Sequence, residues 1–278
     1  MADFNQLSDS EFRKFSDLIY ANIGISMKME KKELLNARLG KRLRICRINS
    51  FAAYYEFINQ PEQKKLEFVH FLDSVSTNFT SFFREISHFD YLKDNVLPEF
   101  LRLNGTSGRD LSFWSAASSS GEEPYTLAMV LNDFKVLNRH FRYKIVATDI
   151  STKVLALAAR GVYAVEQTAK TPPEYLKKYF QKGVGKSSGK VKVRDEVRQQ
   201  VSFQRFNLMD DFPWHNEFDV IFCRNVMIYF DRDTQQRLVE KFYKSVAKGG
   251  YLFIGHSESI SGLKHNFLQV EATTYKKV

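Results

Sequence analysis

Apolar residues recur at helical spacing through the first part of the chain. Between Phe12 and Ile19 they lie three or four positions apart, which places them on one face of an α-helix. Ser8 and Glu11 stand at capping-box spacing before this run, and Gly24 follows it. Further helices are predicted within KKELLNARLGKRLRICR, SFAAYYEFIN and EQKKLEFVHFLDSVS. The pattern predicts a helical domain over residues 1–90.

From about Leu111 the pattern changes to short apolar runs that alternate with helical ones. The apolar runs, each typical of a buried strand, are LSFWSA, YKIVATDIS, VSFQRFNL, FDVIFCRN and GGYLFIGHS. The helical runs are EEPYTLAMVLNDFKVL, TKVLALAARGVY and RDTQQRLVEKFYKSVA. This alternation predicts an α/β domain over residues 91–278, with a largely parallel sheet and helices on both faces. In such a sheet, ligands bind at the carboxyl ends of the strands.

One stretch breaks the alternation. Residues 165–200 contain TPPEYLKKYF, followed by the glycine- and lysine-rich QKGVGKSSGKVKVRDEVRQQ. Alternating residues separated by glycine turns are typical of short antiparallel strands. We expect a small β-subdomain inserted into the α/β domain.

The chain is basic, with a formal net charge of +9 over 278 residues, of which 44% are hydrophobic. A basic surface fits a partner rich in phosphates or carboxylates. Solvation of a basic protein explains the charge equally well, because no block of lysines and arginines is interleaved with aromatic residues as in an RNA-binding platform. We expect no nucleic-acid partner.

The sequence predicts neither export nor insertion into a membrane. No apolar run approaches the ~20 residues of a transmembrane helix, and the N-terminus, MADFNQLSDSEFRKF, is too polar for a secretory signal. We expect a cytoplasmic protein. Cys46 and Cys223 lie far apart, and no His/Cys cluster has metal-binding spacing. We therefore expect reduced cysteines, no disulfide and no metal site.

The end of the first predicted strand carries the first candidate site. The small residues of SAASSSG, residues 115–121, let a ligand approach the backbone, and the following helix N-terminus adds amide groups. The stretch is not GxGxxG, so alone it indicates a nucleotide site only weakly. We interpret Glu122 as a ligand-binding residue, and Glu123 as a carboxylate that interacts with the helix dipole.

Polar residues also follow three other predicted strands. Asp149, in VATDIS, either accepts hydrogen bonds from the ribose of an adenosine-containing cofactor or forms an N-cap or Asx turn, since Asp149 and Ser151 both precede a helix. Asn207 follows a strand in RFNLMD, and Arg224 and Asn225 follow one in FDVIFCRNVMIYFD. A charge beside so much apolar surface needs a partner, which we expect to be a ligand or an internal carboxylate.

Five segments, in this order and at these spacings, resemble the CheR family of bacterial chemotaxis receptor methyltransferases: TNFTSFFRE, WSAASSSGEEPYTLA, ATDIS, FCRNVMIYF and GGYLFIGHSES. The resemblance runs from the N-terminal helices to about Ile260. It implies an N-terminal helical domain followed by a Rossmann-like methyltransferase domain. It also implies transfer of a methyl group from S-adenosylmethionine to glutamate side chains on the cytoplasmic helices of chemoreceptors, which forms γ-methyl esters that reset signalling.

The resemblance assigns roles to individual residues. Arg84 and Tyr229 would orient the substrate carboxylate, although packing against the cofactor alone is the alternative. The residues implied to bind the cofactor are Asn78, Thr80, Arg84, Glu122, Asp149, Asn207, Leu208, Arg224 and Asn225. Because a glutamate with a pKa of about 4.3 is ionised at neutral pH, positioning and desolvation rather than a strong base should carry the reaction.

Two surfaces are candidate receptor contacts. A basic helix face could dock on acidic receptor helices, although a solvated face explains it equally well; its residues are Arg38, Lys41, Arg42 and Arg44. The 165–200 insertion resembles the family's β-subdomain, which in some members captures a C-terminal receptor pentapeptide as an added edge strand. Gly183, Gly185 and Arg194 favour this tethering.

The sequence can be compared with three other functions besides receptor methylation. A CheR-like domain could bind cofactor or receptor without turnover. A nucleic-acid methyltransferase would need an Asn/Asp-Pro-Pro-Tyr/Phe tetrapeptide or a Pro-Cys nucleophile, and the sequence has neither. A nicotinamide dehydrogenase would need a glycine-rich fingerprint after the first strand, which SAASSSG does not provide.

Overall fold

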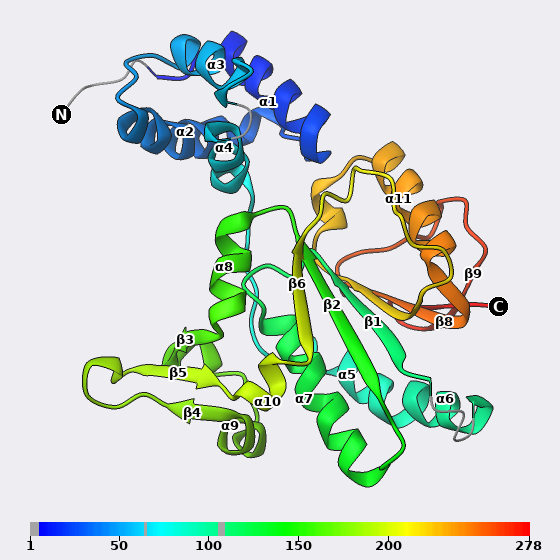
Figure 1. The fold of residues 1–278 in the computed structure, drawn as a ribbon. Helices are drawn as coiled ribbons and strands as arrows, with labels where there is room; N and C mark the ends of the chain where they lie inside the picture. Colours follow the sequence, from blue (N-terminus) through cyan, green and yellow to red (C-terminus); the bar gives the residue numbers. More distant parts are fainter. Residues whose placement is uncertain (1–5, 64–65, 105–108) are drawn as a thin grey trace.

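The computed structural model describes residues 6–63, 66–104 and 109–278. The first part of the chain is helical (Figure 1, blue to cyan) and consists of α1 (Asp9–Ile23), η1 (Met29–Lys31), α2 (Lys32–Cys46), α3 (Phe51–Asn59) and α4 (Glu67–Val75). These helices enclose a hydrophobic core of their own, built from side chains between Leu7 and Val75. From Phe82 onward the buried apolar residues belong to the cores around the large sheet.

The predicted capping box at the start of α1 is confirmed. The Ser8 hydroxyl accepts a hydrogen bond from the Glu11 amide at 3.3 Å, and the Glu11 carboxylate accepts one from the Ser8 amide at 2.9 Å. Gly24 ends the helix with a φ of +71°, and a Cβ there would lie 2.4 Å from Met209 Sδ. The last predicted helix is shorter than expected, because α4 begins at Glu67; positions 64–65 lie outside the described residues.

A buried ion pair joins three helices of this part. Glu67, which is 6% exposed, accepts hydrogen bonds from Arg42 Nε at 2.9 Å and from Arg42 Nη2 at 2.6 Å. The Tyr54 hydroxyl donates to the same carboxylate at 2.7 Å. Burial alone would raise the pKa of Glu67, but these hydrogen bonds bring it below its usual range. The pair therefore links α2, α3 and α4 from inside.

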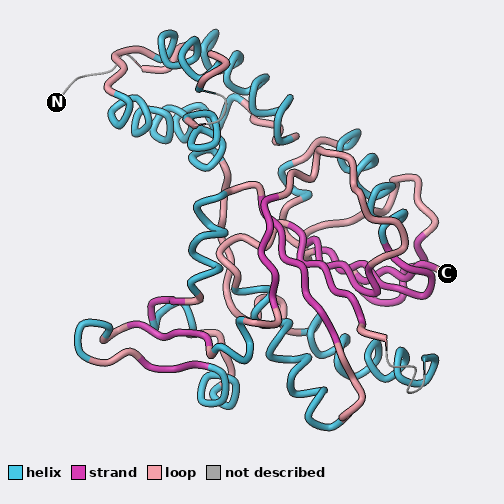
Figure 2. Tube along the Cα trace, viewed as in Figure 1, coloured by secondary structure: helices cyan, strands magenta, loops and turns pink. Residues whose placement is uncertain are grey.

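The second part contains the predicted α/β sheet, which Figure 2 shows in magenta below the strand-free helical part. In spatial order its strands are β6 (Val201–Arg205), β2 (Tyr143–Asp149), β1 (Leu111–Ala116), β7 (Phe218–Cys223), β8 (Val246–Ile254), β10 (Thr274–Lys277) and β9 (Phe267–Glu271). Neighbours from β6 to β8 are parallel, whereas β10 is antiparallel to both β8 and β9. The fold class is confirmed; the hairpin of β9 and β10 was not predicted.

Helices and short turns surround this sheet. They are α5 (Ser87–Tyr91), the π-helix η3 (Leu92–Val96), α6 (Leu97–Asn104), α7 (Glu122–Leu137), α8 (Thr152–Arg160), η6 (Met227–Tyr229) and α11 (Arg232–Ser245). Successive residues of β1 point to opposite faces: Phe113 packs in the core that includes α7, and Trp114 packs in the core that includes α11. The sheet is therefore covered on both faces.

A three-stranded antiparallel sheet follows α8 and projects from the molecule (Figure 1, yellow-green). It consists of β3 (Val162–Ala164), β5 (Lys190–Val193) and β4 (Phe180–Lys182), accompanied by η4 (Val165–Thr168), α9 (Pro173–Tyr179), η5 (Gly185–Ser187) and α10 (Asp195–Arg198). The inserted β-subdomain is thus present, and its first strand begins at Val162, ahead of the expected start at residue 165.

The helical part is joined to the sheet domain by side chains as well as by the chain itself. The Asn207 side-chain amide donates to the Asn22 carbonyl at 2.7 Å, and the Tyr20 hydroxyl donates to Asp231 at 2.7 Å. Ile25 forms an isolated antiparallel bridge with Phe230. The end of α1 is therefore held against the carboxyl edge of the sheet.

Within the described ranges, no helix is both long and apolar enough to cross a membrane.

Candidate functional site

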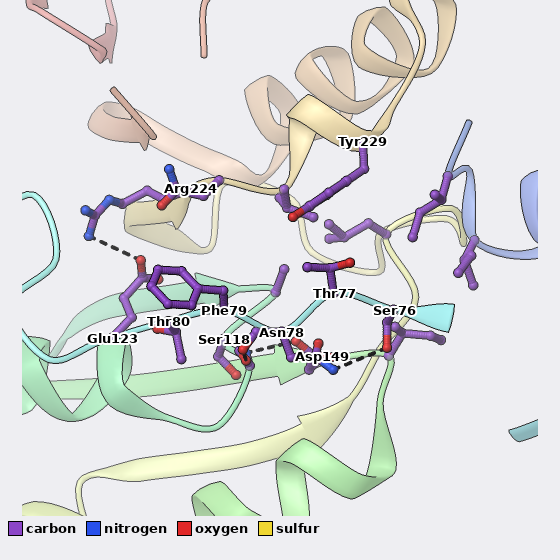
Figure 3. Close-up of a pocket in the computed structure, with 18 of the residues that line it drawn as sticks. Ser76, Thr77, Asn78, Phe79, Thr80, Ser118, Glu123, Asp149, Arg224 and Tyr229 are labelled. Carbon is purple, nitrogen blue, oxygen red and sulfur yellow. Dashed lines mark hydrogen bonds and ion pairs between the residues drawn. The ribbon is translucent and has the colours of Figure 1, made fainter. Parts of the chain in front are cut away.

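A cavity opens where the helical part meets the carboxyl ends of the parallel strands. Its position is where ligands bind in sheets of this kind. The predicted site residues that line it are Asn78, Thr80, Arg84, Asp149, Asn207, Leu208, Arg224, Asn225 and Tyr229. In Figure 3, Arg224 and Tyr229 lie on one side of the cavity, and Asn78 and Asp149 lie on the other. The cavity thus gathers residues from segments far apart in the sequence.

Arg224, directly after β7, is a deeply buried charge in this wall, with a side chain that is 1% exposed. Its guanidinium pairs with Glu85 at 2.8 Å and with Glu123 at 3.3 Å, and it donates to the Arg84 carbonyl. The guanidinium carbon lies 5.4 Å from the centre of the Phe89 ring, a cation–π contact. The expected partner of this charge is therefore a pair of internal carboxylates.

The two adjacent glutamates have the opposite placement to the one predicted. Glu123 lines the cavity, where it pairs with Arg224 and accepts a hydrogen bond from the Ser115 hydroxyl at 2.7 Å. Glu122 does not line the cavity; its carboxylate accepts a hydrogen bond from Ser120 at 2.7 Å, and burial raises its pKa. Successive helix residues point about 100° apart, so the two carboxylates have different surroundings. The ligand-binding role of Glu122 stays a prediction, and Glu123 is a further candidate that the structure places at the cavity.

The Asp149 carboxylate accepts hydrogen bonds from backbone amides in the turns that follow β1 and β2. The donors are the Ser119 and Ser151 amides, both at 2.9 Å. Burial raises the pKa of Asp149, and these amide hydrogen bonds oppose the rise. Ser151, rather than Asp149, caps α8, since its hydroxyl accepts from the Val154 amide. Asp149 faces the cavity, so its remaining lone pairs can meet hydroxyl groups of a ligand.

The segment between α4 and α5 forms another wall. Arg84 Nη1 donates to the Phe79 carbonyl at 3.0 Å, and the guanidinium lies 5.5 Å from the centre of the Phe79 ring. The Phe79 ring is 73% exposed at the cavity mouth. Phe83 and Glu85 have φ values of 53° and 55°, a left-handed conformation that non-glycine residues seldom adopt. The segment is thus held in a strained turn beside the cavity.

Asn207 and Tyr229 connect the site with the helical part. The Asn207 side-chain oxygen Oδ1 accepts from the Met209 amide at 3.1 Å, while its side-chain nitrogen Nδ2 donates to the Asn22 carbonyl near the end of α1. The Tyr229 side chain extends into the cavity (Figure 3), and Lys31 Nζ lies 5.7 Å from the centre of its ring. The Asn207 side chain therefore serves mainly to fix this wall.

Two acids that the sequence analysis missed shape the site. Glu85 holds Arg224, and its other oxygen accepts from the Asn225 side chain at 3.0 Å. Glu258, 7% exposed, accepts from the Asn225 amide at 2.8 Å and from the Ile228 amide at 3.3 Å. Both acids occur within the quoted motifs TNFTSFFRE and GGYLFIGHSES, which is the signal that could have identified them.

The predicted receptor-binding residues lie elsewhere, and two of them are already engaged. Arg42 is committed to Glu67, and Arg38 donates to the Val75 carbonyl and to the Thr77 hydroxyl. The Arg42 guanidinium is therefore not available as predicted, whereas the half-buried Arg38 keeps further N–H groups and its receptor contact stays a prediction. Lys41 and Arg44 are exposed on α2. Gly183 and Gly185 lie in the connection between β4 and β5 of the small sheet, and the exposed Arg194 directly follows β5.

Comparisons with known proteins agree with this arrangement. Residues 10–76 match the family described as CheR methyltransferase, all-alpha domain, and residues 78–276 match CheR methyltransferase, SAM binding domain. The chain is 39% identical over 275 residues to the chemotaxis protein methyltransferase of Borreliella burgdorferi, covering 98% of this chain and 95% of that protein. It is 39% identical over 270 residues to the chemotaxis protein methyltransferase of Escherichia coli, covering 97% and 91%.

Replacing Arg224 with lysine should destabilise the whole protein. A lysine ammonium cannot span Glu85, Glu123 and the Arg84 carbonyl together, so at least one buried carboxylate loses its partner. We expect the free energy of unfolding to fall by about 3–5 kcal/mol in urea denaturation. Arg13→Lys, at an exposed position of α1, is the matched control and should leave the free energy of unfolding unchanged. Equal effects of the two substitutions would contradict the role given to Arg224.

Proposed function

The chain belongs to the CheR methyltransferase family, and on that premise we propose that it methylates glutamate side chains of chemoreceptors, with S-adenosylmethionine as the methyl donor. The product is a γ-methyl ester that serves sensory adaptation, and S-adenosylhomocysteine is released. The observation that carries this function is the convergence of the motif residues of TNFTSFFRE, ATDIS and FCRNVMIYF on one cavity. The reaction makes the protein a protein-glutamate O-methyltransferase.

The cavity suits S-adenosylmethionine chemically. Asp149, together with Glu123 that pairs with Arg224, places carboxylates in its wall, and these favour a ligand with sulfonium and ammonium charges. Ile150, Phe206 and Leu208 give another part of the wall an apolar surface that fits an adenine ring. We propose that Asp149 meets the ribose hydroxyls and that Glu123, rather than Glu122, meets the positive end of the ligand.

The residues of the chain then have to position an ionised glutamate. When bound, S-adenosylmethionine supplies an electrophilic methyl group, so a strong base is unnecessary. Arg84 donates one hydrogen bond to the Phe79 carbonyl, and its guanidinium has further N–H groups for a substrate carboxylate. The Tyr229 hydroxyl can donate to the second carboxylate oxygen. Alignment of this kind lowers the activation free energy by up to about 7–11 kcal/mol in favourable systems.

Arg224 has a different part in this proposal from Arg84. Its guanidinium already contacts Glu85, Glu123 and the Arg84 carbonyl. It therefore supports the backbone of Arg84 and the carboxylate of Glu123 and does not bind substrate itself. Through these contacts it fixes the two residues that we place against substrate and cofactor.

The exposed basic residues of α2 are proposed as a receptor contact. Lys41 and Arg44 are three positions apart on one helix, so they face the same side. Arg38, one turn earlier, ties this helix to Thr77 in the cavity wall. A receptor helix with acidic residues could meet Lys41 and Arg44 while one of its glutamates reaches the cavity.

A second receptor contact is proposed at the small sheet. Its strand order, β3-β5-β4, leaves β4 at an edge, where an extended peptide can add as a further strand. Gly183 is needed where β4 ends, since a Cβ there would lie 2.1 Å from the Ser187 carbonyl oxygen. The exposed Arg194, beside β5, could receive the carboxylate of a receptor C-terminal pentapeptide.

The proposed reaction is tested by transfer of labelled methyl groups to receptor-containing membranes, followed by a base-lability test of the product. Wild-type protein should give base-labile label on the receptor. Arg84→Ala should lower kcat by at least about a hundredfold, because the substrate carboxylate loses its orienting donor, whereas Arg102→Ala on the exposed side of α6 is the control. Wild-type turnover by Arg84→Ala would remove Arg84 from the mechanism. Cofactor binding without transfer by the wild type would favour a non-catalytic binding module.

Charge reversal should separate receptor docking from chemistry. We expect Lys41→Glu combined with Arg44→Glu to raise the KM for receptor membranes several-fold at low ionic strength, with less effect at high salt. Binding of S-adenosylhomocysteine, measured by calorimetry, should stay unchanged. Lys135→Glu combined with Arg139→Glu reverses two exposed charges near the end of α7 and is the matched control. Similar KM values for both double variants would reject this docking face.

Tethering predicts that the last five residues of the receptor speed methylation. Deleting them should slow methylation by wild-type protein several-fold. Arg194→Ala should slow methylation of the intact receptor and have no further effect on the shortened one, whereas Arg160→Ala on the exposed face of α8 should have neither effect. Equal rates with intact and shortened receptors would reject tethering and leave the methyltransferase activity standing.

A further inference from the structure

Three side chains that the proposed reaction does not use as ligands converge behind Arg224. They are Glu85, His88 at the start of α5 and His256 just after β8, and each offers one ligand atom within 4.8 Å of the others. We propose that they form a binding site for a divalent transition-metal ion of the Zn²⁺ class, at the border of the cofactor cavity. No metal was expected from the sequence, because no His/Cys cluster has metal-binding spacing; Glu85 and His88 are three positions apart, but His256 lies about 170 positions further along the chain.

The hydrogen bonds of His88 fix its proton away from the proposed ion. Its Nε2 lies 2.8 Å from the Thr273 hydroxyl, which itself donates to the Ala272 carbonyl at 2.7 Å. Because the hydroxyl proton is used there, the hydroxyl oxygen accepts from His88, and Nε2 carries the ring proton. Nδ1 is then left with a lone pair, as in a metal-ligating histidine whose other nitrogen donates to an outer partner.

That lone pair has an unusual environment. His88 is 3% exposed, and its Nδ1 has no hydrogen-bond partner among the described residues. The atom that it faces is an oxygen of the Glu85 carboxylate, 3.7 Å away. The buried, unpartnered Nδ1 of His88 therefore faces an oxygen of the half-buried Glu85 carboxylate, an arrangement that a cation between them would satisfy.

His256 completes the group from the solvent side. Its ring centre lies 4.7 Å from that of His88, with an angle of 77° between the rings. Its Nε2 is 3.2 Å from the Ser87 hydroxyl, and the residue is exposed. An exposed third ligand gives the ion a path into a site whose other two ligands are fixed by packing and hydrogen bonds.

The donor set points to the chemical class of the ion. Two imidazoles and one carboxylate form a nitrogen-rich set that suits Zn²⁺ and related ions better than Mg²⁺ or Ca²⁺. Bonds of about 2.0–2.2 Å require ligand atoms no more than about 4.4 Å apart, so the group has to contract by a few tenths of an ångström. Rotation of the exposed His256 side chain can supply that movement.

Arg224 limits the strength of this site and connects it with the cavity. The Glu85 oxygen that faces His88 also accepts from Arg224 at 2.8 Å, and a carboxylate oxygen has a second lone pair for an ion. The neighbouring guanidinium charge weakens cation binding, so the affinity should be moderate. Arg224 and Asn225, both partners of Glu85, line the cofactor cavity, so the ion would sit directly behind its wall.

The test uses the full chain, first freed of metal with a chelator. Calorimetric titration with Zn²⁺ should show saturable binding of one ion per chain, and Co²⁺ should give visible ligand-field bands of a low-symmetry nitrogen/oxygen site. His256→Ala should weaken Zn²⁺ binding at least tenfold and abolish the bands. His70→Ala removes an exposed histidine of α4 and is the matched control, with binding unchanged.

Two results would overturn the proposal. Saturable binding could be absent, which would mean that only a water molecule fills the space between Glu85 and His88. Alternatively, His256→Ala could bind Zn²⁺ as tightly as the wild type, which would place the ion elsewhere. Because His256 is exposed, its loss should not unfold the protein, and circular dichroism of the variant checks this point. Neither result bears on methyl transfer.

Discussion

The architecture of the cavity depends on the burial of the Arg224 guanidinium between two carboxylates. Removing such a charge from water costs several kcal/mol, which is offset only if each donor meets a well-placed acceptor. Those acceptors lie on two different pieces of the chain, the strained turn after α4 and the first turn of α7. Glu85 also accepts a hydrogen bond from Asn225, which adds the loop after β7 to the same group. The charge therefore forces these pieces into one arrangement, and the cavity is the space that this arrangement leaves.

Much of this could be predicted because it follows from short-range patterns. The capping box of Ser8, the alternation of strands and helices, and the polar residues at strand ends each depend on neighbours in the sequence. The placement of Glu122 and Glu123 could not be predicted, since both stand at the start of one helix and only the helix rotation decides which faces the cavity. Arg42 was misjudged for a related reason: its partner Glu67 lies on another helix.

The hairpin of β9 and β10 was missed because its pattern is not that of a buried strand. In β9 only Phe267 is buried, and the other positions are polar or partly exposed, as in an edge strand. The backbone conformation of the cavity wall could not be predicted from the sequence pattern either. Ala117, Ser119 and Asn225 all have positive φ values and line the cavity, although none is glycine. Such conformations persist only where contacts with the surrounding structure impose them, so local sequence does not predict them.

The contacts between α1 and the carboxyl edge of the sheet bear on how this kind of protein can diversify. Ile23 and Ile25 form part of the cavity wall, and Asn22 and Tyr20 anchor them to the loops after β6 and β7. The helical part is thus a structural half of the binding pocket. Recombination that exchanged it between distant relatives would have to preserve this seam, so the two parts should be inherited together as a single unit of selection.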